Sequence, residues 1–314
     1  MNIAIDVMGG DYAPEAVIDG IIQSIPSLTN KEVILAIGPK EIIDQLLAER
    51  HCTSDQIRVI HAEEVIEMGE HPTRALSQKP NSSIGIGFAL LKEGKADVFA
   101  SAGNTGAMMV GSLFSVKTIE GIQRPAIAGF VPQVNGKYAV MLDIGANADC
   151  KPEMLEQWGL LGSVYFEATT GQSNPRVGLM NIGEEEGKGS ILAQATHALL
   201  KENKQLNFIG NIEGKDLFRN KADVIVTDGF TGNIVLKMGE SIYNIMKEQG
   251  MMNDFVENTN YENYGGSPII GINGNVIIAH GASSPKAIKN MIKLCKSVVE
   301  SNVCQKIKVA IEEK

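Results

Sequence analysis

The chain has 314 residues, of which 44% are hydrophobic and 21% charged, and its formal net charge is −9. This length and composition are typical of a globular protein with a large core, and they exclude a disordered chain. The negative charge argues against a general nucleic-acid-binding protein, because such proteins are normally basic.

No apolar stretch approaches the roughly 18–20 residues that are needed to span a bilayer. We expect no signal peptide, because the segment 2–6 already reads as a β-strand and no basic segment precedes it. None of the four cysteines belongs to a CxxC pair, which indicates reduced thiols and no metal site. These features predict a cytoplasmic protein, with peripheral contact at the inner face of the membrane left open.

Apolar runs alternate with amphipathic segments along most of the chain. Strands are expected at 2–6, 33–37, 57–60, 97–100, 126–131, 138–143, 176–180, 207–210, 223–226 and 276–279. Helices are expected at 14–25, 39–50, 83–93, 104–118, 152–168, 189–203 and 231–248, with two more over 285–314. The alternation predicts βαβ units in a three-layer α/β/α sandwich with a mostly parallel sheet. We expect residues 1–314 to form a single catalytic domain.

Three segments depart from this alternation. Residues 120–143 hold two strands with a short connection, and we expect a hairpin arm at an edge or against a second subunit. Residues 247–266 have little apolar pattern and are expected to form an excursion loop. The stretch 285–314 carries seven lysines against three acidic residues, which fits either a solvated helix face or a docking surface.

Polar turns rich in glycine and asparagine follow most of the predicted strands. These turns lie at 8–11, 101–106, 143–147, 181–189, 227–233 and 279–281. In an open α/β sheet the carboxyl ends of the strands line the ligand crevice, so we expect the turns to converge there. Glycine lets the backbone approach an anion closely, and N–H groups at helix starts bind it. The pattern predicts an enzyme that binds a phosphate-like ligand.

The turn 181–189 reads Asn-Ile-Gly-Glu-Glu-Glu-Gly-Lys-Gly and superficially resembles a P-loop. Its spacing is one residue short, and Gly189 replaces the Ser or Thr that would hold magnesium. Three glutamates would also repel a triphosphate, so ATP is not expected. Lys188, at the start of a helix, is a candidate to bind a single phosphate, and the structural alternative is a flexible acidic turn.

Ser101, Gly103, Asn104 and Thr105 form a turn of small and polar residues before an apolar helix. Such a turn offers donors to a phosphate or an oxyanion. Ordinary helix capping explains the same residues almost equally well.

The turn 227–233 repeats this arrangement of strand, turn and helix. Asn233 lies in the first helical turn and is a candidate to hydrogen-bond a carbonyl, whereas Asp228 either contacts substrate or caps the helix. Asp143 and Asn147 either orient cationic groups or tie their own turn together.

His280 directly follows a predicted strand, which is where chemistry is expected, and histidine titrates near neutrality. Arg124 and Arg176 each adjoin a proline at a strand start, where each either neutralises a phosphate or forms a structural ion pair. Asn211, close behind the strand at 207–210, completes the candidate substrate contacts. The absence of GxGxxG, GxSxG and HExxH motifs disfavours dinucleotide, serine hydrolase and zinc protease sites.

Taken together, the segments 6–11, 101–106, 142–147, 227–233 and 264–266 resemble the bacterial acyl-acyl carrier protein:phosphate acyltransferase family of phospholipid synthesis. The resemblance implies a fold like the isocitrate and isopropylmalate dehydrogenases and phosphotransacetylase, and a homodimer. It implies transfer of a fatty acyl group from acyl carrier protein to inorganic phosphate, without cofactor or metal. The acyl phosphate would pass to a membrane glycerol-3-phosphate acyltransferase.

On this hypothesis Lys188 holds the attacking phosphate, Asn233 polarises the thioester carbonyl, and His280 protonates the sulfur or positions phosphate. An acidic carrier protein needs a basic docking patch on an acidic enzyme. Candidates for that patch are the lysines of 286–308 together with Lys201, Lys204, Lys215, Arg219 and Lys221.

Family members usually carry a longer helical excursion before 264–266, associated with contact to the membrane surface. Here 247–263 is short and polar, which weakens the expectation of lipid binding. Three alternatives stay open. They are a phosphotransacetylase that uses acyl-coenzyme A, a metal- and nicotinamide-dependent decarboxylating dehydrogenase of the same fold, and a non-catalytic scaffold.

Overall fold

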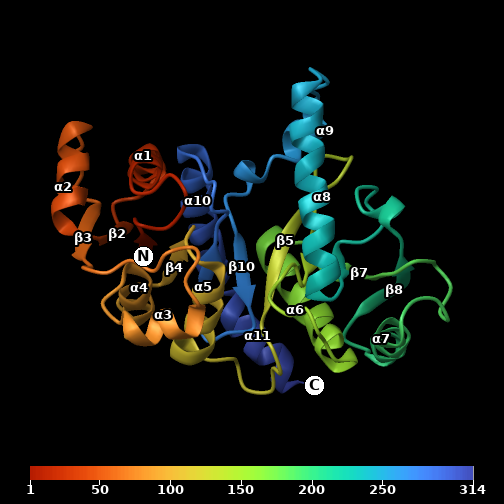
Figure 1. Ribbon diagram of the computed structural model, residues 1–314. Helices are drawn as coiled ribbons and strands as arrows, with labels where there is room; N and C mark the ends of the chain where they lie inside the picture. Colours follow the sequence, from red (N-terminus) through yellow and green to blue (C-terminus); the bar gives the residue numbers. More distant parts are fainter. Residues whose placement is uncertain (314) are drawn as a thin grey trace. The chain divides into compact units, whose positions relative to one another are not determined.

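The computed structural model of the protein describes residues 1–313, which form two compact units (Figure 1). The first unit contains Met1–Thr118 and Glu262–Glu300, and the second begins with Ile119–Tyr261 and takes up the chain again from Ser301. In both units helices flank a mostly parallel sheet, so the predicted α/β class is confirmed. The expectation of one catalytic domain stays a prediction.

In the first unit the strands are hydrogen-bonded in the order β3-β2-β1-β4-β11-β10. The parallel strands are β1 (Asn2–Asp6), β2 (Val33–Gly38), β3 (Ile57–His61), β4 (Val98–Ser101) and β11 (Val276–Ile278). β10 (Ser267–Ile270) runs antiparallel to β11. The helices of this unit are α1 (Glu15–Ser24), α2 (Lys40–Glu49), α3 (Pro72–Gln78), α4 (Ser83–Lys92), α5 (Thr105–Gly111) and α10 (Pro285–Ser301).

In the second unit the strand order is β5-β6-β9-β7-β8. The strands are β5 (Ala126–Pro132), β6 (Tyr138–Leu142), β7 (Arg176–Met180), β8 (Asn207–Ile212) and β9 (Val224–Val226). β5 and β6 form an antiparallel hairpin, and β6, β9, β7 and β8 are parallel to one another. The helices are α6 (Pro152–Thr170), α7 (Ile191–Glu202), α8 (Gly229–Glu248), α9 (Asp254–Asn258) and α11 (Val303–Glu312).

Most strands are continuous apolar runs because they are covered on both faces, as parallel sheets require. In β1, for example, Ile3, Ala4 and Ile5 are each 0% exposed. Glycines let helices approach such strands closely. A Cβ atom on Gly162 of α6 would lie 2.6 Å from Val224 Cγ1, so only glycine fits at this crossing.

The hairpin predicted within 120–143 is present, with Gly136 at φ +78° in its turn. β6 is hydrogen-bonded to β9 on its other side, so the hairpin is built into the sheet and does not project as an arm. The expected loop 247–266 includes α9, which Asn253 caps by accepting a hydrogen bond from Val256 N at 3.0 Å. Phe255 of α9 packs edge-on against Phe218, 5.7 Å away between ring centroids, which anchors the segment to the second unit.

Within residues 1–313 there is no helix whose length and apolar character would let it cross a membrane.

Arg176, at the start of β7, forms a structural ion pair with Asp223, which was the default expectation for this arginine. Its guanidinium donates to both carboxylate oxygens, at 2.9 and 2.8 Å, and also to Asn220 O. Burial alone would raise the pKa of Asp223, but the hydrogen bonds and charge of Arg176 hold that pKa below its ordinary value of 3.8. The pair therefore contributes stability only while the carboxyl is ionised.

We expect Arg176→Met to lower the free energy of unfolding by about 2 kcal/mol near neutral pH, because it leaves Asp223 unpaired. This is less than for a fully buried pair, because the arginine side chain is 35% exposed. The difference from wild type should be complete above pH about 4 and should vanish as the pH falls through the depressed pKa of Asp223. Urea unfolding at several pH values measures it, and a pH-independent difference would contradict this account.

Candidate active site

The carboxyl ends of β6, β9, β7 and β8 meet at one edge of the second unit, because these neighbouring strands are parallel. This edge carries the turns 143–147, 227–233 and 181–189, followed by Asn211 near the end of β8. Adjacent strands lie about 4.8 Å apart, so turns on neighbouring strands are within reach of one small ligand. We call this the site edge of the second unit.

In the first unit the carboxyl ends of β1, β4 and β11 also meet, because these strands are adjacent and parallel. The turns 8–11, 101–104 and 279–281 follow them. Asp11 N donates a hydrogen bond to Gly281 O at 2.7 Å, which joins the first and the last of these turns. Within each unit the turns thus follow adjacent parallel strands, and their convergence into one ligand crevice stays a prediction.

Asp6 is buried beneath the turns of the first unit and holds two of them through hydrogen bonds. It is 2% exposed, and its carboxylate accepts hydrogen bonds from Met8 N at 3.0 Å and from Ser101 Oγ at 2.6 Å. Ser101 Oγ in turn accepts from Gly103 N at 2.9 Å. Burial raises the pKa of Asp6, while these donors oppose the rise. The Ser101 hydroxyl is thus engaged in shaping the turn.

Asn104 is the N-cap of α5, where its Oδ1 accepts from Ala107 N at 2.9 Å. Its Nδ2 donates to the carbonyl oxygens of Glu67 and Glu70, both at 3.0 Å. The side chain therefore ties the segment 67–70 to the turn, and the capping explanation is confirmed. Thr105, next in the chain, is exposed.

His280 follows β11 directly and its side chain is exposed. Ala282 N donates a hydrogen bond to His280 Nδ1 at 3.1 Å. Because Nδ1 is an acceptor here, the neutral ring carries its proton on Nε2.

In the second unit Asp143 organises the turn after β6. The carboxylate is 0% exposed and accepts hydrogen bonds from the backbone N–H groups of Ile127, Ala146 and Asn147. Asn147 Nδ2 also donates to it at 3.0 Å, and to Pro125 O at 2.9 Å. Burial raises the pKa of Asp143 above its ordinary value of 3.8, against the effect of these donors. Both side chains tie the turn together.

The start of α8 presents Asn233. Asp228 is the N-cap and accepts from Thr231 N and from Thr231 Oγ1, both at 2.8 Å. This occupies the Asp228 carboxylate with capping. Asn233, one turn further along α8, is exposed on the site edge. Its amide is thus available to a ligand.

Four contacts hold the loop 181–189 in shape. Asn181 Nδ2 donates to Lys188 O at 3.1 Å, and Asn211 Nδ2 donates to Glu185 O at 2.8 Å. Glu184 pairs with Lys221 at 2.9 Å. Glu186 pairs with Lys201 at 2.5 Å. The three glutamates were predicted to repel a triphosphate, but two of the three are neutralised by lysines.

Lys188 is exposed at the end of this loop, and its ammonium forms no ion pair with any residue of the described range 1–313. Its stem lies against Gly183, where an added Cβ would be 3.0 Å from Lys188 Cγ. The loop therefore holds one unpaired cation next to the backbone N–H groups at the start of α7. This arrangement suits a small anion.

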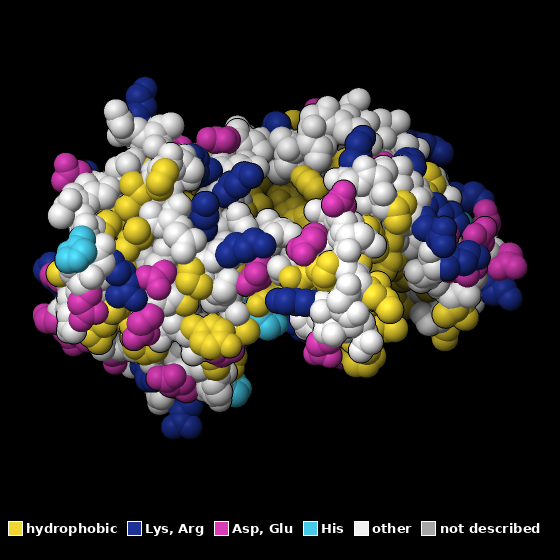
Figure 2. All heavy atoms as spheres, turned by 90° about the horizontal axis from the view of Figure 1, so that it is seen from above, with side chains coloured by type: hydrophobic (Ala, Val, Ile, Leu, Met, Phe, Trp, Pro, Cys, Tyr) yellow, Lys and Arg dark blue, Asp and Glu magenta, His cyan; other side chains and the backbone are white. Residues whose placement is uncertain are grey.

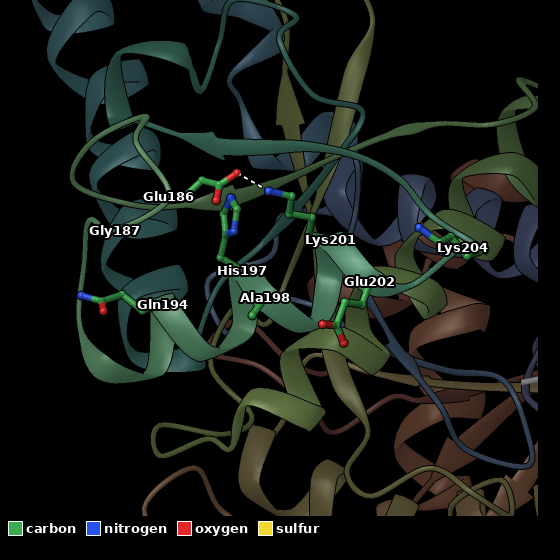
Figure 3. Close-up of a pocket in the computed structure, with 8 residues that line it drawn as sticks. All are labelled: Glu186, Gly187, Gln194, His197, Ala198, Lys201, Glu202 and Lys204. Atoms are coloured by element: carbon green, nitrogen blue, oxygen red, sulfur yellow. Dashed lines mark hydrogen bonds and ion pairs between the residues drawn. The ribbon is translucent and has the colours of Figure 1, made fainter.

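A surface depression of about 760 Å³ lies beside this loop, over α7 (Figure 3). Glu186 and Lys201 face one another across one of its walls. His197, 5% exposed, packs edge-on against Phe208 with 5.0 Å between ring centroids. The lining mixes carboxylates with lysines, so it has no single preference for a charged ligand.

Arg124 is exposed, and Trp158 Nε1 donates to its carbonyl oxygen at 3.0 Å, which fixes the backbone before β5. Cys150, near the Asp143 turn, donates its thiol to Asn147 O at 3.2 Å. Burial raises the pKa of this thiol to about 11. The thiol is therefore protonated near neutral pH and is not a nucleophile.

On the site edge of the second unit, Asn211 of β8 holds the loop that carries Lys188. On the same edge, the residues around the start of α8 are Asp143, Asn147, Asp228 and Asn233. Ser101, Gly103, Asn104 and His280 belong to the first unit. Asp6 and the segment 67–70 were not predicted from the sequence to belong to the site. The available signal for Asp6 was an aspartate that ends a buried strand three residues before the pair Gly9-Gly10.

The fold is shared with solved enzymes of low sequence identity. A phosphotransacetylase from Streptococcus pyogenes has a TM-score of 0.68 at 17% identity, covering 97% of this chain and 94% of that one. A branched-chain phosphotransacylase from Enterococcus faecalis has a TM-score of 0.64 at 14% identity, covering 95% and 99%. A 4-hydroxythreonine-4-phosphate dehydrogenase from Klebsiella pneumoniae has a TM-score of 0.56 at 15% identity, covering 95% and 99%. The chain thus has an α/β fold like that of these phosphotransacetylases.

Sequence comparison narrows this class. The family described as "Fatty acid synthesis protein" matches residues 1–306. Phosphate acyltransferase of Dictyoglomus turgidum is 44% identical, over 98% of this chain and 96% of the relative. Phosphate acyltransferase of Bacillus subtilis is 42% identical, over 100% and 98%. The chain belongs to the phosphate acyltransferase family, so the resemblance inferred from the sequence motifs is confirmed.

Proposed function

We propose that this enzyme transfers a fatty acyl group from the thioester of acyl carrier protein to inorganic phosphate, giving acyl phosphate. The observation that carries the proposal is the loop 181–189, in which Lys188 stays unpaired while Glu184 and Glu186 are neutralised. A phosphate bound there lies on the site edge that also presents Asn233. No cofactor enters the reaction.

The nucleophile needs little activation. Phosphate has its second pKa near 7 (about 6 in phosphoesters), so much of it is dianionic at neutral pH and attacks without a strong base. Lys188 orients one oxygen of the dianion toward the thioester and offsets part of its charge. This explains why the site edge has no activated nucleophile of its own, since the thiol of Cys150 is protonated.

Attack on the thioester carbon places negative charge on the carbonyl oxygen. Asn233 donates a hydrogen bond from its amide to this oxygen, which stabilises the tetrahedral intermediate more than the substrate. The carbon–sulfur bond then breaks and the acyl–oxygen bond to phosphate remains. A neutral amide suits this role because it does not compete with Lys188 for the phosphate.

The leaving group is a thiolate whose conjugate acid has a pKa of about 8.5 when free, so mild assistance suffices. The proposal assigns this proton transfer to His280, and the sulfur leaves as the thiol once protonated. The hydrogen bond from Ala282 N to Nδ1 keeps the ring in the tautomer that carries its proton on Nε2. The alternative role of His280, positioning phosphate, would not require the ring to carry its proton on Nε2.

The carrier protein docks on α10 in this proposal. Lys286, Lys289 and Lys293 recur at intervals of three and four, so they lie on one face of the helix. All three are exposed, and none pairs with a residue in the described part of the chain. α10 begins five residues after His280, so this lysine stripe starts at the site edge of the first unit. Figure 2 shows Lys and Arg side chains spread over the upper face of the molecule, interspersed with Asp and Glu.

We expect Lys289→Glu to raise the KM for acyl-acyl carrier protein about 5- to 10-fold, because it places a negative charge against an acidic partner. The KM for a small uncharged thioester should stay within about 2-fold, and the effect should shrink as salt screens the charges. The control is Lys92→Glu, an exposed lysine that precedes β4 at the opposite edge of the same sheet. Equal changes with both donors, or with both variants, would contradict docking on α10.

The second candidate function is the same reaction with acyl-coenzyme A as the acyl donor. It is supported by the fold that the chain shares with a phosphotransacetylase. Comparing kcat/KM for the two acyl donors at equal acyl-chain length distinguishes the two candidate functions. A preference of at least about 10-fold for the carrier-protein thioester, roughly 1.4 kcal/mol, supports the proposal. The opposite preference supports the coenzyme A reading.

We further propose a homodimer that assembles through α8. Phe230, Ile234, Met238, Ile242 and Ile245 follow one another at intervals of four, four, four and three, so they form one apolar face. Their exposure is high, with Met238 at 67% and Ile245 at 56%. An exposed apolar face of this kind is typical of a protein interface. A second copy of the same helix would bury it symmetrically.

Met238→Glu should weaken this dimer, because it brings two carboxylates into an apolar interface. We expect sedimentation to show two copies for the wild type and a single copy for the variant at micromolar concentration. Glu248→Lys, at the exposed end of the same helix, is the control and should leave the dimer intact. A wild-type monomer, or a variant dimer of undiminished affinity, would count against this interface.

The product completes the proposal. Acyl phosphate would pass to a membrane glycerol-3-phosphate acyltransferase, which requires release near the inner face of the membrane. A coupled assay with vesicles containing such an acyltransferase, in which glycerol 3-phosphate is acylated only when this enzyme is present, tests the hand-over.

A further inference from the structure

The Asp143 carboxylate touches no solvent, yet it lies at the site edge of the second unit. Oδ1 accepts from Ile127 N at 3.0 Å and from Ala146 N at 3.2 Å. Oδ2 accepts from Asn147 N at 2.6 Å and from Asn147 Nδ2 at 3.0 Å. All four donors belong to the protein, so the group is engaged in holding structure at the place where substrate is expected.

The first turn of α8 rests directly on this group. A Cβ atom on Gly229 would lie 2.7 Å from Asp143 Oδ2, and one on Gly232 would lie 1.9 Å from Asp143 O. No side chain fits at either position without displacing the helix. Gly229 N also donates to Asn147 O at 2.9 Å, which joins the helix start to the same turn.

Asn233 lies against the turn that Asp143 holds. Gly145, in the middle of that turn, has φ +138°. A Cβ atom on Gly145 would be 3.6 Å from Cβ, Cγ and Oδ1 of Asn233, which is ordinary van der Waals distance. The turn 143–147 thus forms one wall of the space available to the Asn233 amide.

We propose that Asp143 is a positioning residue that orients the Asn233 amide toward the substrate carbonyl oxygen. Asp143 acts through the two segments that it contacts, the turn 143–147 and the first turn of α8. The inference rests on the proposed function, because it takes Asn233 as the donor to the developing oxyanion. It assigns Asp143 an indirect role in place of direct contact with substrate.

A carboxylate suits this position because it only accepts hydrogen bonds and faces four donors. Asparagine has the same shape, but its NH₂ group would face N–H donors, so the contacts of one of the two oxygens would be lost. A shift of about 1 Å in a positioning group costs about 100-fold in rate. Asp143→Asn should therefore affect turnover through Asn233 without removing any group that contacts substrate.

The test is a double-mutant cycle on kcat with acyl-acyl carrier protein and phosphate. Asp143→Asn alone should lower kcat about 10- to 100-fold with little change in the KM for phosphate. In an Asn233→Ala background the same change should cost less than about 3-fold, because the group it positions is gone. Losses that multiply, or a wild-type kcat for Asp143→Asn, would overturn the inference.

Asp223→Asn is the matched control, since Asp223 is 5% exposed, lies in the same unit and pairs with Arg176 away from α8. It should lower the melting temperature, as Asp143→Asn does, but leave kcat within about 2-fold. If Asp143→Asn does not fold, Asn147→Ala removes one donor to the carboxylate and should show the same non-additivity with Asn233→Ala.

Hydrogen exchange separates this inference from the proposed function. Asp143→Asn should speed amide exchange in peptides covering 143–147 and 229–236, whatever reaction the enzyme catalyses. If the wild type forms no acyl phosphate but exchange rises, the proposed function fails and the positioning of Asn233 by Asp143 stands. Unchanged exchange at 229–236 would overturn the positioning role itself.

Discussion

Replacing Asn233 with alanine is expected to lower kcat about 100- to 1000-fold, the usual cost of removing one oxyanion donor. The KM for both substrates should change little, because the hydrogen bond strengthens only as charge develops on the carbonyl oxygen. Asn233 is exposed one turn into α8, directly after the first turn, which packs against Asp143 and is capped by Asp228. Steady-state kinetics with acyl-acyl carrier protein and phosphate measure the loss.

Asn244→Ala is the control for this experiment, because Asn244 is an exposed asparagine on the same helix, three turns further on. It should retain kcat within about 2-fold, as surface substitutions normally do. An Asn233→Ala enzyme with kcat within a few-fold of wild type would show that this amide does not stabilise the transition state.

Replacing Lys188 with alanine is expected to lower kcat/KM for phosphate by about 10- to 150-fold, the equivalent of about 1.5–3 kcal/mol for a hydrogen bond to a charged group. Much of the effect should appear as a higher KM for phosphate, because Lys188 binds phosphate before and during attack. The loss should be larger at low ionic strength, because salt screens an exposed cation. Initial rates at varied phosphate concentration measure it.

Lys137→Ala controls for the loss of a positive charge, since Lys137 is exposed in the β5–β6 turn of the same unit. Lys201→Ala tests the surroundings of Lys188, because it leaves Glu186 of the loop 181–189 without its lysine partner. It should raise the KM for phosphate less than Lys188→Ala does. A larger effect at Lys201 than at Lys188 would mean that the phosphate site has been misplaced.

The sequence predicts most of the fold because the strands carry strong local signals. β1 and β2 are unbroken apolar runs, and proline or glycine marks the limits of helices such as α6, which begins at Pro152 and is followed by Gly171 in the left-handed region at φ 74°. β10 was missed because it is only four residues long and contains Pro268. Its place depends on pairing with β11, which no local pattern reveals.

The candidate site was predictable where a residue type by itself suggests chemistry. Lys188, Asn233 and His280 stand out because each follows a strand in a polar turn. Which buried groups contact a ligand and which hold the structure could not be predicted from the sequence. From the sequence Asp143 was a candidate ligand contact or turn residue and Asp6 had no assigned role. Only their burial and hydrogen bonds show that both hold the turns. Such contacts join residues up to 95 positions apart.

The same limit applies to the charges of the loop 181–189. In sequence its three glutamates argue against a triphosphate, because the lysines that pair with two of them, Lys201, Lys215 and Lys221, lie 15 or more positions away. In the fold Glu184 and Glu186 are paired with these lysines, so the local field at Lys188 is less negative than the sequence indicates. Ion pairs between residues far apart in the sequence thus make the charge around Lys188 less negative.

The most direct measurement is the stoichiometry of acyl transfer. The purified enzyme is incubated with an acyl-acyl carrier protein and inorganic phosphate, the free thiol is titrated, and acyl phosphate is trapped with hydroxylamine. We predict one acyl phosphate for each thiol released, and no thiol release when phosphate is omitted. Thiol release that continues without phosphate and yields free fatty acid would contradict the account.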